Sequence, residues 1–178
     1  MKLFGWGGKA SKRAIAAAPA PASPAAAADA PSPPTPDQAL ALLREGNQAF
    51  LRGEGNLGHV RVEDLNPLQG GQHPIATVVA CADSRTPPTI LFNQGFGRLF
   101  SIRVAGNTVD RRGLSSIVYA VKHLACPLVV VMGHTGCGAV AAAEAIVDGT
   151  SPLDPSLEEM IVPIIPAVLD ARRLLRQT

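Results

Sequence analysis

Three residues of the types that bind metal ions follow two apolar runs of the chain. Cys81 comes directly after "PIATVVA", and His134 and Cys137 lie in "GHTGCGA", at the end of a second apolar run. Two sulfurs and one imidazole nitrogen favour Zn²⁺, and three protein ligands leave a fourth position for water, as catalytic zinc sites require. The residue types therefore predict a reactive zinc site, although a lone cysteine after a strand is more often a small buried hydrophobic residue.

A carboxylate and a guanidinium follow the first of these ligands. Asp83 and Arg85 lie with Cys81 in "CADSR". The guanidinium would keep the carboxylate ionised, and an ionised carboxylate can accept and orient a hydrogen bond from a reacting oxygen. The alternative interpretation is a surface salt bridge that caps a helix. We predict that both side chains stand beside the metal ligands.

Strand ends must position these side chains. The segments 74–82 and 127–134 are short, apolar and rich in β-branched residues, which is typical of strands buried on both faces of a parallel sheet. Segment 98–106 is a third, less uniform candidate. Because the carboxyl ends of parallel strands meet at one edge of a sheet, loops distant in sequence can form a single site there.

Helical patterns alternate with the later strands. In the segment 113–125, Ile117, Val121 and Leu124 fall on one helical face, and a second helix is expected to end at Gly149. The order strand, helix, strand, helix predicts an α/β fold, with an open, mostly parallel sheet flanked by helices.

Two further helical segments bracket this unit. The first is expected to begin at a cap, Thr35 or Asp37, and to end at Gly53. The last segment of the chain is also helical in pattern, but Pro163 and Pro166 must kink or divide it.

The chain divides into two parts by composition. Residues 1–36 are rich in Ala, Pro and Ser and cannot bury enough apolar surface to offset their ordering entropy, so we interpret them as a disordered tether. The alternative is a targeting segment, because basic residues precede the alanine-rich stretch. Residues 37–178 are expected to form a single domain.

Composition limits the classes of partner. Sixteen basic and fourteen acidic residues give a net charge of +2, which does not indicate binding to nucleic acid or to an anionic membrane. No stretch of eighteen apolar residues free of charge and proline occurs, so we expect no membrane-spanning helix. We therefore expect a soluble, cytoplasmic protein, with export or organelle import by the N-terminal segment as the alternative.

The motif pair "CADSR" and "HTGCGA" resembles the signature of the β-class carbonic anhydrases. The likeness extends from about residue 37 to the end and includes "GQHP", "FNQGFGRLFSIRVAGN" and "YAVKHLACPLVVVMGH". The resemblance implies a homodimer or a higher even oligomer with the active-site cleft at the subunit contact. Members of this family usually continue into a further strand and terminal helices, which this chain, ending at Thr178, is expected to lack.

The resemblance also implies the chemistry. One Zn²⁺ per chain would be held by Cys81, His134 and Cys137, with Asp83 and Arg85 as the adjacent dyad. The implied reaction is the reversible hydration of CO₂ to bicarbonate and a proton through a zinc-bound hydroxide. Two alternatives stay open: hydrolysis of a CO₂ analogue such as carbon disulfide or carbonyl sulfide at the same site, and a non-catalytic zinc-binding scaffold.

The substrate pocket follows from the resemblance position by position. Gln72 matches the family's amide that hydrogen-bonds substrate oxygen, and Phe100 and Tyr119 match positions that wall an apolar pocket for CO₂. His123 matches a proposed proton relay. The alternative for His123 is a solvated helix histidine.

Overall fold

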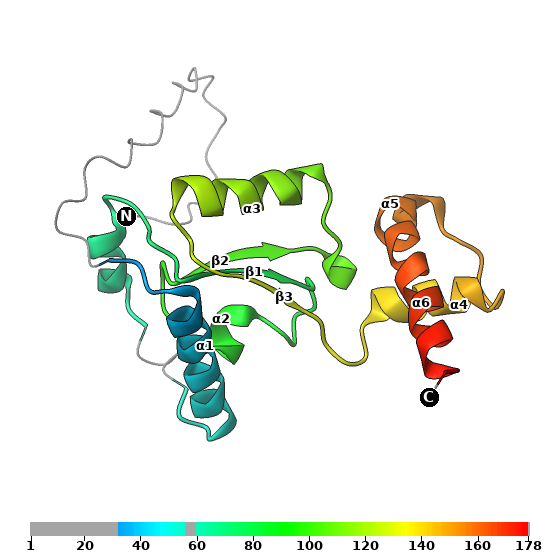
Figure 1. Cartoon of the computed structure of the whole chain (residues 1–178), viewed down its shortest axis with the longest axis horizontal. Helices are drawn as coiled ribbons and strands as arrows, with labels where there is room; N and C mark the ends of the chain where they lie inside the picture. The colour runs from blue at the N-terminus through cyan, green and yellow to red at the C-terminus, as the bar shows by residue number, and fades with distance from the viewer. Residues whose placement is uncertain (1–31, 56–59, 178) are drawn as a thin grey trace, which may run out of the picture. The chain divides into compact units, whose positions relative to one another are not determined.

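The computed structural model describes residues 32–55 and 60–177 and contains a parallel sheet of three strands (Figure 1). The strands are β1 (Ala76–Ala80), β2 (Leu99–Arg103) and β3 (Val129–Met132), in the order β2-β1-β3. This confirms the predicted α/β class, with strands shorter than the predicted segments. Most of the predicted tether, residues 1–31, lies outside the described residues.

The register of the sheet explains why distant loops meet. Ala80 at the end of β1 lies opposite Arg103 at the end of β2 and Met132 at the end of β3. All three strands therefore end at the same edge. The loops that carry "CADSR" and "HTGCGA" leave from this edge.

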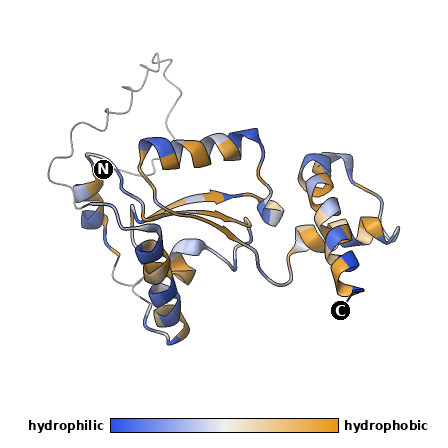
Figure 2. Cartoon of the chain, viewed as in Figure 1, coloured by the Kyte–Doolittle hydropathy of each residue, from blue (hydrophilic) through white to orange (hydrophobic). Residues whose placement is uncertain are grey.

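The central strand is the most buried part of the molecule. All five residues of β1 are buried because strands flank it on both sides, and Figure 2 shows the strands largely in the orange of hydrophobic residues. The one polar residue of β1, Thr77, is buried and donates a hydrogen bond from Oγ1 to Sγ of Cys126 over 3.3 Å. Cys126 is 4% exposed, so this third cysteine is a packing residue of the core.

Strand β3 differs from the prediction. The sequence pattern predicts burial on both faces, but Val129 and Val131 are 40% and 68% exposed. The physical reason is that Val129 and Val131 point to the same face of β3, one of the two edge strands of the sheet, and this face is only partly covered. An apolar run predicts a strand without showing whether an element covers each of its faces.

Helices cover both faces of the sheet. Figure 1 shows α3 (Arg111–His123) on one face, and α1 (Pro36–Leu51) and α2 (Pro88–Leu91) on the other. Thr35 caps α1 through a capping box with Gln38, one of the two predicted caps. A short 3₁₀ helix, η3 (Val62–Leu68), precedes β1.

The chain from residue 138 onward is helical and lies beyond the carboxyl edge of the sheet (Figure 1). Pro163 and Pro166 divide the last helical segment, as predicted, because each lies in the first turn of a new helix. The elements of this part are α4 (Gly138–Val147), η5 (Pro155–Leu157), α5 (Glu158–Ile161), η6 (Val162–Ile164) and α6 (Ile165–Leu175). Across residues 32–55 and 60–177, no helix is long and apolar enough to span a membrane.

Candidate metal centre

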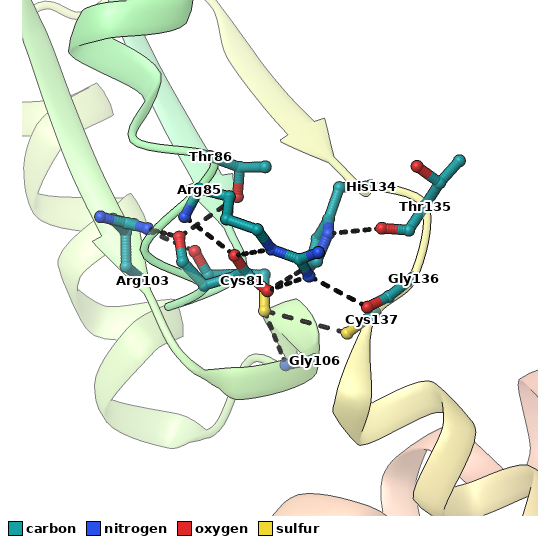
Figure 3. A network of polar contacts seen from close by, with 10 residues as sticks. Cys81, Arg85, Thr86, Arg103, Gly106, His134, Thr135, Gly136 and Cys137 are labelled. Carbon is teal, nitrogen blue, oxygen red and sulfur yellow. Dashed lines mark hydrogen bonds and ion pairs between the residues drawn. The ribbon is translucent and has the colours of Figure 1, made fainter.

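Two cysteines and a histidine meet at the carboxyl edge of the sheet. Cys81 follows β1, and His134 and Cys137 lie between β3 and α4. One potential ligand atom from each residue lies within 4.8 Å of the other two, and the two Sγ atoms are 3.9 Å apart. The structure thus brings together the three residues predicted as metal ligands (Figure 3).

A tight turn lets the second loop present two of these side chains. Gly136 has a φ of +65°, a left-handed conformation that favours glycine. Cys137 is the N-cap residue of α4, so the helix begins at the next residue, Gly138. Both sulfurs are buried, with Cys81 4% and Cys137 8% exposed.

The imidazole of His134 fits a metal ligand by its surroundings. Its Nδ1 lies 3.0 Å from the carbonyl oxygen of Thr135 and can donate a hydrogen bond to it. Its Nε2 is buried and has no hydrogen-bond partner within the described part of the chain. A buried polar atom without a partner is costly, and an Nε2 lone pair beside two thiol sulfurs is a donor set that suits Zn²⁺. These three residues therefore fit a zinc ion.

The surroundings of Cys81 favour its thiolate form. Burial alone raises the pKa of the thiol, but the backbone N–H of Asp83, the imidazole of His134 and the N–H of Gly106 outweigh burial and lower the pKa to about 7. The Gly106 N–H donates to Sγ over 3.3 Å. The neighbouring Cys81 sulfur in turn raises the pKa of His134. A thiolate is the form that binds a metal ion.

Asp83 and Arg85 form a two-pronged ion pair beside this cluster. Nε and Nη2 of Arg85 donate to the two carboxylate oxygens over 2.9 and 2.7 Å. The guanidinium holds the pKa of Asp83 well below its usual range. Oδ2 of Asp83 lies 3.9 Å from Nε2 of His134, so the carboxylate borders the ligand atoms.

Arg85 also joins the two loops. Its Nη2 donates to the carbonyl oxygen of Gly136 over 3.1 Å. One guanidinium therefore contacts both the segment that carries Cys81 and the segment that carries His134 and Cys137. A surface salt bridge that caps a helix, the alternative for Asp83 and Arg85, does not account for this contact, because Arg85 donates to the backbone of another loop.

Two residues of the site were missed by sequence reasoning. Arg103 donates from Nε to the carbonyl oxygen of Cys81 over 3.0 Å and from Nη2 to that of Asp83 over 2.6 Å. Gly106 binds the Cys81 sulfur through its backbone N–H. Both lie in "IRVAGN", which the sequence pattern predicts as the end of a strand and which carries part of the family resemblance, but neither residue is predicted to act in the site. Arg103 is a charged residue at the end of a predicted strand, and this position is the signal that could have identified it.

The predicted pocket residues lie before β1, on β2 and on α3. Gln72 is exposed and precedes β1. The ring of Phe100 on β2 lies 6.2 Å from the ring of Tyr119, which stacks on the exposed His123 at 5.4 Å. Over the described ranges, no hydrogen bond, ion pair or ring contact joins these four residues to Cys81, His134 or Cys137.

Comparison with known proteins links the chain to one family. Residues 76–178 match the family model described as carbonic anhydrase, and this range contains the whole metal-ligand cluster and the Asp83–Arg85 pair. Carbonic anhydrase 2 of Mycobacterium tuberculosis H37Rv is 43% identical over 132 residues, which cover 74% of this chain and 63% of that protein. The carbonic anhydrase of Mycolicibacterium smegmatis is 37% identical over 131 residues, which cover 74% of this chain and 64% of that protein. The chain thus spans less than two thirds of the length of these relatives.

Solved structures give the same comparison in three dimensions. A tetrameric β-carbonic anhydrase from Sordaria macrospora aligns with a TM-score of 0.58 and 25% identity, over 79% of this chain and 70% of that chain. The β-carbonic anhydrase CafA of Aspergillus fumigatus aligns with a TM-score of 0.56 and 29% identity, over 80% of this chain and 64% of that chain.

Proposed function

Because this chain belongs to the carbonic anhydrase family, in its β class, we propose that it catalyses the reversible hydration of CO₂ to bicarbonate and a proton. The observation that supports this most is the meeting of Cys81, His134 and Cys137 within 4.8 Å, with the Asp83–Arg85 pair at their border. A donor set of this kind beside an ionised, oriented carboxylate suits the activation of water.

The two cysteines and the histidine would hold Zn²⁺, one ion per chain. When bound, Zn²⁺ supplies the Lewis acidity that makes a nucleophile from water at neutral pH. The low pKa of Cys81 prepares one sulfur for this role. Burial of both sulfurs keeps solvent away from the ligand atoms.

Asp83 would direct the reacting oxygen. Because Arg85 keeps Asp83 ionised, the carboxylate can only accept hydrogen bonds. It accepts one from the attacking water and thereby turns an oxygen lone pair toward the carbon of CO₂. Arg85 fixes the direction of the carboxylate through two parallel hydrogen bonds.

The substrate pocket would be completed by a second copy of the chain. We assign substrate binding to Gln72, Phe100 and Tyr119, and a proton relay to His123. Across the described residues none of them forms a hydrogen bond, an ion pair or a ring contact with the ligand cluster of its own chain, whereas a cleft at a subunit contact would let one subunit supply these residues to the other. We therefore expect a homodimer or a higher even oligomer, which agrees with the tetrameric relatives from Sordaria macrospora.

The test is stopped-flow CO₂ hydration on purified protein with its zinc content measured. We expect about one zinc per chain in the wild type and loss of both zinc and activity in Cys137→Ser, because the variant removes one of three ligands. Cys126→Ala is the matched control, since Cys126 is equally buried but lies outside the ligand cluster, and it should keep zinc and activity.

Two outcomes would overturn the proposal. A wild type that holds zinc and does not hydrate CO₂ would indicate a zinc-binding scaffold. Turnover of carbon disulfide or carbonyl sulfide by such a protein would instead assign the hydrolase activity to the same site.

A further inference from the structure

Arg103 binds the backbone of the loop that carries a metal ligand and the oriented carboxylate. It is the last residue of β2 and lies opposite Ala80 in the register. Its side chain reaches past the end of β1 and donates to the carbonyl oxygens of Cys81 and Asp83, over 3.0 and 2.6 Å. Figure 3 shows Arg103 beside Cys81. The two carbonyl groups that accept these bonds belong to the residues on either side of Ala82.

The loop has other anchors besides Arg103: Arg85 donates to the carbonyl oxygen of Gly136, Gly106 N–H donates to the Cys81 sulfur, and Thr86 N–H donates to the carbonyl oxygen of Asp83 over 3.1 Å. Backbone hydrogen bonds between β1 and β2 continue one step past the strands, from Val104 to Ala80 and from Ala82 to Val104, each over 3.2 Å. Beyond Ala82 the ladder stops. The guanidinium of Arg103 therefore extends the attachment of the loop to β2 by one further carbonyl, that of Asp83.

The two arginines of the site act on different parts of the loop. Arg85 binds the side chain of Asp83, and its own side chain is 64% exposed. Arg103 binds main-chain oxygens in a partly buried setting and forms no ion pair in the described portion of the chain. The guanidinium carries its N–H donors on separate nitrogens in a fixed plane, so it can bind two carbonyl oxygens at once. The ammonium of a lysine carries its donors on one nitrogen and cannot reproduce this pair of bonds.

We propose that Arg103 is a positioning residue for the metal centre. By fixing the carbonyls of Cys81 and Asp83, it sets the direction in which the Cys81 sulfur and the Asp83 carboxylate leave the backbone. Arg103 contacts neither a ligand atom nor the reacting oxygen. The inference rests on the proposed function only where it concerns catalysis, because the effect of Arg103 on metal binding can be measured separately.

The experiment compares Arg103→Met, Arg103→Lys and the control Arg98→Met. Arg98 is an exposed arginine just before the same strand, and its side chain forms no hydrogen bond or ion pair within residues 32–55 and 60–177. Each protein is loaded with zinc, and transfer of the metal to a chromophoric chelator is followed. Partners of metal ligands contribute roughly 10–100-fold to metal affinity or activity, so we expect Arg103→Met to weaken zinc binding by about that factor, with a smaller effect in Arg103→Lys.

Two further measurements distinguish positioning from general stability. The absorption spectrum of the cobalt-substituted protein reports ligand geometry and should change in Arg103→Met while Arg98→Met matches the wild type. In stopped-flow assays, kcat should fall more than KM rises, because the directed carboxylate acts on the reacting oxygen. If Arg103→Met does not fold, as judged by circular dichroism, the same measurements compare Arg103→Lys with Arg98→Met and the wild type.

The outcomes are separable from those of the proposed function. A folded Arg103 variant with the zinc affinity and cobalt spectrum of the wild type would overturn the inference, whatever its activity. A zinc-loaded wild type without CO₂ hydration would overturn the proposed function and leave the comparison of zinc affinities valid.

Discussion

Two apolar cores within residues 32–55 and 60–177 differ in what they contain. The core between α1 and the sheet is built from Ala39, Leu43, Ile75 and Ala76, with no potential metal ligand among its buried members. The core of the C-terminal helices contains Ile161, Ile164 and Val168 together with the sulfurs of Cys81 and Cys137. The first core contains hydrophobic side chains alone, whereas the second contains two of the three proposed metal ligands.

This difference indicates how the C-terminal helices support the site. Ile164 packs against Gly106, and the N–H of Gly106 binds the Cys81 sulfur. A change in the helical core therefore has a short path of contacts to a ligand, while a change in the α1 core does not. Variants of matched size in the two cores can test this.

The largest effect is expected from Ile164→Ala compared with Leu43→Ala. Both side chains are buried, 7% and 1% exposed, and each truncation should reduce the free energy of unfolding by about 2–5 kcal/mol through lost burial and a cavity. Only Ile164→Ala should also speed the release of zinc, because it removes the support behind Gly106. Denaturant unfolding and chelator transfer measure the two quantities. Equal zinc release from both variants would show that the cores do not differ in this way.

A smaller effect is expected from Gly106→Ala, with Gly149→Ala as the control. Both glycines have a left-handed φ, +71° and +68°, so each substitution adds backbone strain. A Cβ at position 106 would also lie 2.6 Å from Cδ1 of Ile164 and 3.0 Å from Cβ of Ala139, whereas nothing lies within 4 Å at position 149. Overpacking of this kind costs about 1–3 kcal/mol.

The zinc affinity of these two glycine variants sharpens the comparison. Gly106→Ala should weaken zinc binding because the displaced N–H loses its hydrogen bond to Cys81, and Gly149→Ala should not. The double variant Gly106→Ala/Ile164→Val shortens the side chain that the new Cβ meets. It should recover part of the affinity, and no recovery would place the defect in the backbone strain at position 106 or in the contact of the new Cβ with Ala139.

Much of the α/β framework and the meeting of the ligands could be predicted from the sequence, because each depends on local pattern. Apolar β-branched runs define the strands, and ligand-type residues at two strand ends can meet when the strands are parallel neighbours. The role of Arg103 could not be predicted, because it depends on the register between β1 and β2. The exposure of Val131 depends on what covers an edge strand, which the apolar run itself does not encode.

The smallest effect is expected at the surface of the helical core. Arg172 on α6 donates to both carboxylate oxygens of Asp148, the C-cap residue of α4, over 2.5 and 3.0 Å, and this guanidinium lowers the pKa of Asp148. A carboxylate whose pKa is lower in the folded state stabilises that state above its unfolded pKa, and the contribution is lost as the pH falls through the folded value. Asp148→Asn should therefore lower the melting temperature slightly at pH 7, with the difference from wild type shrinking below about pH 4.

Glu54→Gln is the matched control for this ion pair. Glu54 pairs with Arg52 two residues away in sequence, and Arg52 likewise lowers the pKa of its carboxylate. This pair lies just after α1 and joins no two elements, so its loss should change the melting temperature less than the loss of the link between α4 and α6. Melting curves of both variants at low and high salt measure the difference. If the Asp148 variant melts like the Glu54 variant at neutral pH, the ion pair contributes nothing to the docking of α6, and the helical core is held by its apolar side chains and the metal ligands alone.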